Sequence, residues 1–169
     1  MDDSDRRFAD LQPIDQMHGE DAEDTLLLQQ MAADAENYLR SQKWCSAAQC
    51  RYFGGGVGKV FAVFLCRITP TERGIDPWMW VMVGDVPPAY LPFEDAASPA
   101  QAFRQYIDGM SRWVELAQGG EDLTSAEGIP PVNVPATPEW AEVLRRRLDM
   151  LLLLIEPHFE KRGQDELIN

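Results

Sequence analysis

The chain has 169 residues, of which 45% are hydrophobic and 25% are charged, and its formal net charge is −13. A chain of this length buries roughly 70% of its unfolded surface when it folds as one globular domain. Neither the acidic N-terminus nor any apolar run has the hydrophobic length that secretion or membrane spanning requires. We therefore expect a cytoplasmic protein with no membrane contact.

The negative charge is concentrated near the N-terminus. Residues 1–24 contain nine of the 28 acidic side chains and two of the 15 basic ones, a formal charge of −7. Because this segment is poor in apolar residues, we expect a mobile acidic tail over residues 1–20, a single domain over 21–162 and a frayed C-terminus over 163–169. The tail either solubilises the protein or approaches a basic partner, and its charge opposes nucleic acid.

The first half of the domain predicts one helix and three strands. Apolar residues recur at steps of three and four over 24–42, which indicates an amphipathic helix capped by Asp21 or Asp24. Strands are predicted over 44–53, 59–68 and 78–83, the last two apolar on both alternations and therefore covered on both faces. Short connectors favour antiparallel pairing, since parallel strands need a long crossover.

The second half predicts a loop and two helices. The segment VPPAYLPFEDAA carries three prolines and is expected to run as a loop across the sheet edge. Ser98, Pro99 and Gln101 form a helix start, and the glycines at 119–120 stop that helix. Residues 119–136 are expected to form a long extended loop.

The last helix is predicted to start at Thr137 and Pro138 and to end at Pro157. Arg145, Arg146 and Arg147 form the one basic run, and at least one of them must lie toward the side that carries Leu144 and Leu148. The buried side is expected to hold these residues: Trp140, Leu144, Leu148, Leu151, Leu152 and Ile155. Because the run MLLLLI is apolar around nearly the full circumference, a homodimer through this helix is one possibility.

The resulting order is α-β-β-β-α-α. Segregated strands and helices predict an α+β domain, in which about three helices pack on a small antiparallel sheet of three or more strands.

One stretch, FGGGVGKVFAVF, contains the letters GGVGK over residues 55–59. These letters resemble the deviant Walker A loop of the ParA-like ATPases, which would imply a nucleotide site. The pattern departs at both flanks, because Gly54 stands at the signature lysine and Val60 at the hydroxyl that serves Mg²⁺. A strand pattern follows it, whereas a phosphate loop must open a helix. We therefore favour a glycine-rich hairpin turn, with anion binding by the loop amides and Lys59 as the remaining alternative.

The other reactive residue types give no catalytic pattern. Cys45, Cys50 and Cys66 are an odd set without CxxC spacing, and we interpret them as reduced thiols in or near a sheet. His18 and His158 have no apposed nucleophile and are interpreted as surface residues. The sequence therefore predicts no catalytic residue, no metal site and no cofactor.

The candidate binding residues follow the third predicted strand. Asp85 ends that strand and enters the proline-rich loop, where it either presents a functional carboxylate or bonds turn amides. The loop adds aromatic and acidic side chains typical of an interaction surface. The candidate set is Asp85, Tyr90, Phe93, Glu94 and Asp95.

The leading hypothesis is a non-enzymatic protein that binds another, basic protein, as adaptors, regulators or toxin-neutralising immunity proteins do. The alternative is a small-ligand-binding domain or an enzyme with a carboxylate-lined pocket near Asp85. A deep pocket converging on Asp85 and on Arg51 or Arg67 would favour the alternative, and a flat acidic surface would favour protein binding.

Overall fold

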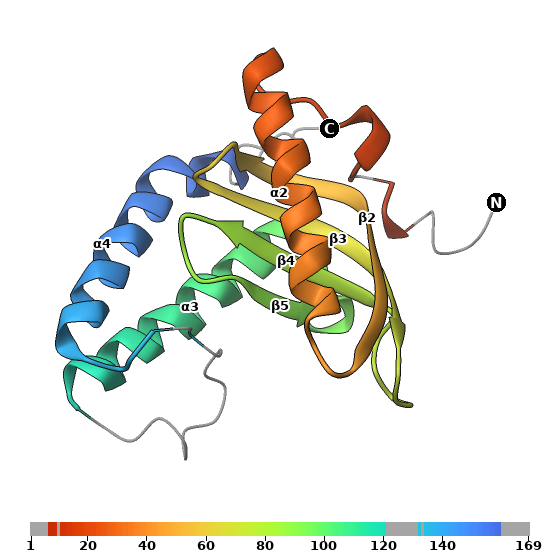
Figure 1. The fold of residues 1–169 in the computed structure, drawn as a ribbon. Helices are drawn as coiled ribbons and strands as arrows, with labels where there is room; N and C mark the ends of the chain where they lie inside the picture. Colours follow the sequence, from red (N-terminus) through yellow and green to blue (C-terminus); the bar gives the residue numbers. More distant parts are fainter. Residues whose placement is uncertain (1–6, 10, 121–131, 133, 160–169) are drawn as a thin grey trace.

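The computed structural model describes residues 7–9, 11–120, 132 and 134–159. Within them the chain forms an antiparallel sheet with the strand order β1-β2-β3-β4-β5 (Figure 1). The strands are β1 (Gln12–Pro13), β2 (Cys45–Val57), β3 (Phe61–Pro70), β4 (Trp78–Gly84) and β5 (Ala89–Pro92). The three predicted strands are the central ones, and each edge carries a further short strand.

Helices cover both faces of this sheet (Figure 1). They are α2 (Ala22–Arg40), α3 (Pro99–Gln118) and α4 (Pro138–Leu154), with short 3-10 turns η1 (Ile14–Gln16) and η2 (Phe93–Asp95). Helix α2 packs on one face, while α3 and α4 pack together on the other. The predicted α+β class and the order of helix, strands and helices are confirmed.

The alternation of β3 divides the interior into two cores. Three of its side chains face α3 and α4: Phe61, Val63 and Leu65. Three others face α2: Ala62, Phe64 and Cys66. All six are fully buried, which confirms the prediction of a central strand covered on both faces.

The three helices begin at side-chain caps. Asp21 accepts a hydrogen bond from the Asp24 amide at 2.8 Å, Ser98 from the Gln101 amide at 3.2 Å, and Thr137 from the Trp140 amide at 3.3 Å. The Gln101 side chain accepts in return from the Ala97 amide at 2.9 Å, and a proline occupies the first turn of both α3 and α4. Each cap satisfies an amide that the helix leaves unpaired, so the predicted starts are confirmed.

The glycine-rich stretch is a hairpin between β2 and β3, as predicted. Its turn is closed by the Val60 amide, which donates to the Val57 carbonyl at 3.1 Å. Two of the glycines lie before the turn, in an irregular part of β2: Gly55 and Gly56 have φ values of 143° and 147°. A Cβ on Gly56 would lie 2.3 Å from the Phe61 carbonyl oxygen, so this position requires glycine.

The proline-rich segment after Asp85 differs from its prediction as a loop. Residues Ala89–Pro92 form β5, which pairs with β4 from Met79 to Met82. Proline is compatible with this placement because β5 is an edge strand, where an amide on the outer side needs no partner. The prediction failed because proline content alone does not exclude an edge strand.

The described part of the N-terminal segment, residues 7–9 and 11–20, contacts the domain. Phe8 is 1% exposed, with ring contacts to Tyr52, Trp78 and Phe93, and Met17 is buried against the α2 side of the sheet. Strand β1 pairs with β2 between them. A single apolar residue such as Phe8 gives no periodic signal in the sequence, yet it anchors the segment to the core.

Helix α4 buries a narrower face than the sequence suggested. Leu144, Leu148 and Leu151 are buried as predicted, but Trp140 is 42% exposed and Leu152 is 40% exposed. Because α4 contacts α3 and the sheet along one side only, apolar residues on its other sides remain at the surface. The predicted segments 163–169 and most of 119–136 lie outside the described residues.

Candidate functional site

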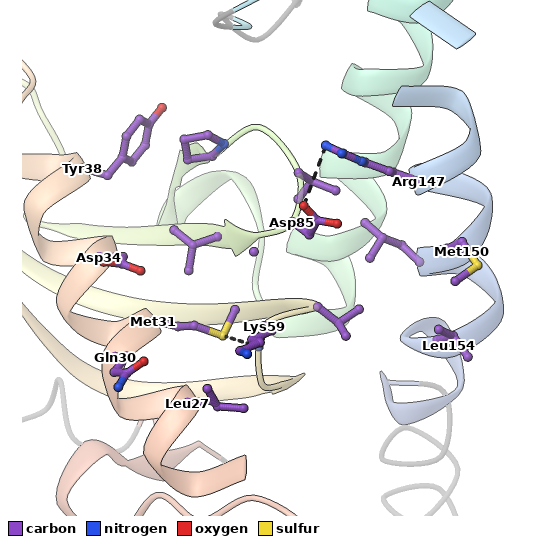
Figure 2. A pocket seen from close by; sticks show the side chains of 16 residues that line it. Leu27, Gln30, Met31, Asp34, Tyr38, Lys59, Asp85, Arg147, Met150 and Leu154 are labelled. Atoms are coloured by element: carbon purple, nitrogen blue, oxygen red, sulfur yellow. Dashed lines mark hydrogen bonds and ion pairs between the residues drawn. The ribbon is translucent and has the colours of Figure 1, made fainter. Parts of the chain in front are cut away.

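The structure has a groove of about 810 Å³ between α2 and α4, across the end of the sheet where the β2–β3 and β4–β5 turns lie. Figure 2 shows α2 as one wall and α4 as the other. The lining residues are Leu27, Gln30, Met31, Asp34, Tyr38, Lys59, Val60, Val83, Gly84, Asp85, Val86, Pro88, Arg147, Met150, Leu151 and Leu154. The walls belong to opposite faces of the sheet, so the groove joins the two layers of the fold.

The α4 wall arises from a second apolar stripe on that helix. The buried stripe faces α3 and the sheet, and beside it lies a stripe whose members recur at steps of three and four: Trp140, Val143, Arg147, Met150 and Leu154. Met150 is 53% exposed and Leu154 is 45% exposed, and both line the groove. The four apolar members of this stripe are all exposed, and exposed apolar side chains in a row are typical of an interaction surface.

The floor of the groove is made by two turns. Val60 comes from the β2–β3 turn, and the β4–β5 turn contributes Val86 and Pro88. The Asp85 amide donates to the Val60 carbonyl at 3.1 Å, which joins the two turns. The Tyr106 hydroxyl donates to the Pro87 carbonyl at 2.7 Å and so fixes the second turn to α3. The two turns are therefore fixed to each other and to α3.

Four charged side chains line the groove, two acidic and two basic: Asp34, Asp85, Lys59 and Arg147. Arg147 lies 3.8 Å from the Asp85 carboxylate, and this pair links α4 to the β4–β5 turn (Figure 2). Asp85 is 76% exposed and Arg147 is 46% exposed, so water screens their attraction and the pair adds little stability. Both groups remain accessible to a binding partner.

Tyr38 supplies a hydroxyl at the α2 wall. Burial, and to a smaller extent the nearby Tyr90, raise the pKa of Tyr38 to about 12. The two rings lie 6.3 Å apart between centroids. Tyr38 therefore keeps its proton at neutral pH and can donate a hydrogen bond to a ligand in the groove.

The amides of the β2–β3 turn, considered above as an anion site with Lys59, already have partners inside the protein. The Gly58 amide donates to the Asp24 carboxylate at 2.7 Å, and the Lys59 amide contacts the Met31 sulfur at 3.3 Å. Asp24 thus occupies the place that an external anion would take. Lys59 has a φ of 69°, so the residue with left-handed conformation at the turn is the lysine itself.

The five predicted binding residues do not gather in one place. Asp85 lines the groove, but Tyr90 lies on the α2 side of the sheet, with its ring 4.7 Å from that of Trp44. Phe93 lies on the opposite side, against Phe8 and Trp80.

The two acidic members lie at the far end of the β4–β5 hairpin from Asp85, in η2. There the Glu94 amide donates to Asp76, and the Asp95 carbonyl accepts from Gln105. The five predicted residues are close in sequence. Because β5 runs back along β4, Glu94 and Asp95 lie at the opposite end of this hairpin from Asp85.

The two arginines whose convergence on Asp85 would favour a ligand pocket do not lie beside it. Arg51 donates to the Gln49 side chain at 3.2 Å, and Arg67 stacks over Trp78 with its guanidinium 5.4 Å from the ring centroid. The arginine beside Asp85 is Arg147. It is the member of the run 145–147 on the groove side, whereas Arg145 and Arg146 pair with Glu142.

The cysteines are free thiols in β2 and β3, in line with the sequence-based interpretation. Cys50 and Cys66 are cross-strand partners with their sulfurs 2.7 Å apart in the α2-side core. Burial, and to a smaller extent the hydrogen bond with Cys50, raises the pKa of the Cys66 thiol well above its ordinary value. These thiols are structural and do not line the groove.

Sequence reasoning missed most of the groove, including Leu27, Met31, Met150 and Leu154. One signal was present, because the run MLLLLI has more apolar residues than one buried face needs. The partner wall could not be found in this way, because Leu27 and Met31 fit an ordinary amphipathic pattern.

Comparisons with protein-family models, with curated proteins and with solved structures gave no match. No helix of the described residues has the length and apolar character needed to cross a membrane. The interpretation of the site therefore depends on its own geometry and chemistry.

Proposed function

We propose that the protein is non-enzymatic and works by binding another protein through the groove between α2 and α4. The observation that carries this proposal is the set of exposed apolar side chains on α4 beside the apolar groove, where Met150 and Leu154 are about half exposed. Contiguous exposed apolar groups with a polar rim are characteristic of protein interaction surfaces.

The charge of the molecule supports a basic partner. The formal charge of −13 gives an overall field that accelerates encounter with cations, and the effect falls with ionic strength. Adaptors and toxin-neutralising immunity proteins act in this way, and we place the protein in that broad class as a hypothesis. In this proposal, the field speeds association while the apolar groove supplies the affinity.

The test is capture of a partner from the native host by the tagged full-length protein, at low and at physiological salt. We expect Met150→Glu to reduce capture about tenfold or more, because it places a charge in the desolvated centre of the contact. The matched control is Leu153→Glu, on the same helix, 71% exposed and outside the groove, which should retain capture. Absence of a stoichiometric partner at low salt, or equal capture by all three proteins, would contradict the proposal.

A second candidate function is small-ligand binding at the same groove. Its volume of about 810 Å³ falls within the range of small-molecule sites, and the carboxylates of Asp34 and Asp85 line it. Native mass spectrometry of the protein purified from its host tests this candidate. A constant adduct that is absent after denaturation, and absent from Met150→Glu, would favour a small ligand over a protein.

A further inference from the structure

The two walls of the groove have matching helical spacing. On α2 the lining residues recur at steps of three and four, and on α4 they do the same: Leu27, Met31, Asp34 and Tyr38 face Arg147, Met150 and Leu154. The helices run in opposite directions (Figure 1), so the start of α2 faces the end of α4. Figure 2 shows this order, with Tyr38 and Arg147 at one end and Leu27 and Leu154 at the other.

We propose that the groove binds a single amphipathic helix of the partner protein, an inference that rests on the proposed function. A ligand helix between two helical walls can set its side-chain ridges into the spaces of both, as helix-in-groove complexes do. The α2 wall from Leu27 to Tyr38 covers about 16 Å along the helix axis, or about three turns. The occupant thus presents apolar residues at i, i+3 or i+4, and i+7.

The distribution of polar groups fixes the chemistry of the occupant. The end near Leu27, Met31 and Leu154 also carries Lys59 and Gln30, while the acidic side chains Asp34 and Asp85 and the Tyr38 ring lie toward the other end (Figure 2). Among the described residues, no ion pair engages Asp34, whereas Asp85 is paired with Arg147. A lysine or arginine about one turn beyond the apolar face would complement Asp34, and the negative charge of the whole chain favours the same sign.

A second copy of this chain fits the groove less well than a partner helix. If two α4 stripes paired over their full length about a two-fold axis, the middle residue of each would meet itself. The middle of the stripe from Trp140 to Leu154 is Arg147, so the centre of such a dimer would place two arginines together. Like charges at a desolvated centre oppose association.

The experiment is selection from a phage-displayed library of random peptides about 15 residues long, about four turns of helix, on the full-length protein. Binders are selected on the wild type alone and are then measured on Met150→Glu, with Leu153→Glu as the matched control target. We expect enriched peptides with apolar residues at helical spacing and a lysine or arginine beside them, bound about tenfold or more tightly by the wild type than by Met150→Glu.

The charge preference is tested on the best peptide with Asp34→Lys. This change should weaken the lysine-containing peptide about fivefold and strengthen its glutamate version. Enriched sequences without helical periodicity, binding that survives Met150→Glu, or a charge preference unchanged by Asp34→Lys would overturn the inference. A dimer in sedimentation that Met150→Glu dissociates would also overturn it, in favour of a second copy. Because host capture uses the native partner, it can succeed while the peptide selection fails, which separates this inference from the proposed function.

Discussion

Helices α3 and α4 pack against each other, yet they use their apolar residues in opposite ways. In α3 eight residues are buried, and none of the exposed large hydrophobic residues of the described chain belongs to this helix. In α4 four residues are buried, and six of the seven exposed large hydrophobics are found there: Trp140, Val143, Met150, Leu152, Leu153 and Leu154. The large apolar side chains of α3 therefore all lie in or near the core, whereas α4 has a buried apolar stripe and a surplus of apolar side chains at the surface.

This surplus is informative because isolated exposed apolar residues are ordinary on protein surfaces, while a continuous stripe is not. On α4 the stripe borders a groove whose opposite wall is also apolar near Leu27 and Met31. We therefore interpret the contrast between the two helices as a division between stability and recognition.

The sharpest test of this contrast compares the same substitution in both helices. Met110 in α3 is fully buried and Met150 in α4 is 53% exposed. We expect Met110→Ala to lower the free energy of unfolding by about 2–5 kcal/mol, because it leaves a cavity. Met150→Ala should change it by less than about 0.5 kcal/mol, as for most surface positions. Urea unfolding followed by tryptophan fluorescence gives both values, and similar losses in the two variants would refute the division.

The helix starts should behave alike, which provides a control for the comparison. Ser98 and Thr137 each cap one helix by accepting an amide hydrogen bond. We expect Ser98→Ala and Thr137→Ala each to cost about 1 kcal/mol of unfolding free energy, measured by the same urea method. If Thr137→Ala had no effect, α4 would contribute little to the cooperative fold, and the core role given to its buried stripe would be wrong.

The smallest effect concerns the outer charges of α4. Hydrogen bonds from Arg145, and then from Arg146, lower the pKa of Glu142 to about 2, from 4.5. Since the folded pKa is lowered, any stabilisation is present above the ordinary carboxyl range and is lost as the pH falls through about 2. NMR titration of the carboxyl carbon should show this midpoint, and Arg145→Gln should move it toward 4.5. Arg112→Gln in α3 should leave it unchanged, and a normal pKa in the wild type would contradict the pairing.

The sequence predicts those parts of the fold that depend on local signals. The predicted start of α3 is confirmed because its signals are local. The Ser98 and Gln101 side chains bond amides at the helix start, and Pro99 occupies the first turn. The central strands were read correctly because a strand buried on both faces is apolar at every position.

The candidate site was mostly missed for a physical reason. The groove combines residues from α2, two turns and α4, and their proximity depends on how far apart the helices pack. Two predicted candidates line it, Asp85 and Lys59, because a strand end and a turn are local features. The partner of Asp85, Arg147, lies more than sixty residues later in the chain. Periodicity shows which residues of a helix are apolar, but it does not show which of two adjacent apolar stripes the core will cover.

The placement of the groove walls on opposite faces of the sheet has a thermodynamic consequence. The α2 wall belongs to one core and the α4 wall to the other, and the two cores share the strands between them. A ligand that contacts both walls would bind the folded protein only when both layers are intact. By mass action it would then raise the melting temperature of the whole molecule with increasing ligand concentration, and it would protect amides of α2 and α4 together from hydrogen exchange.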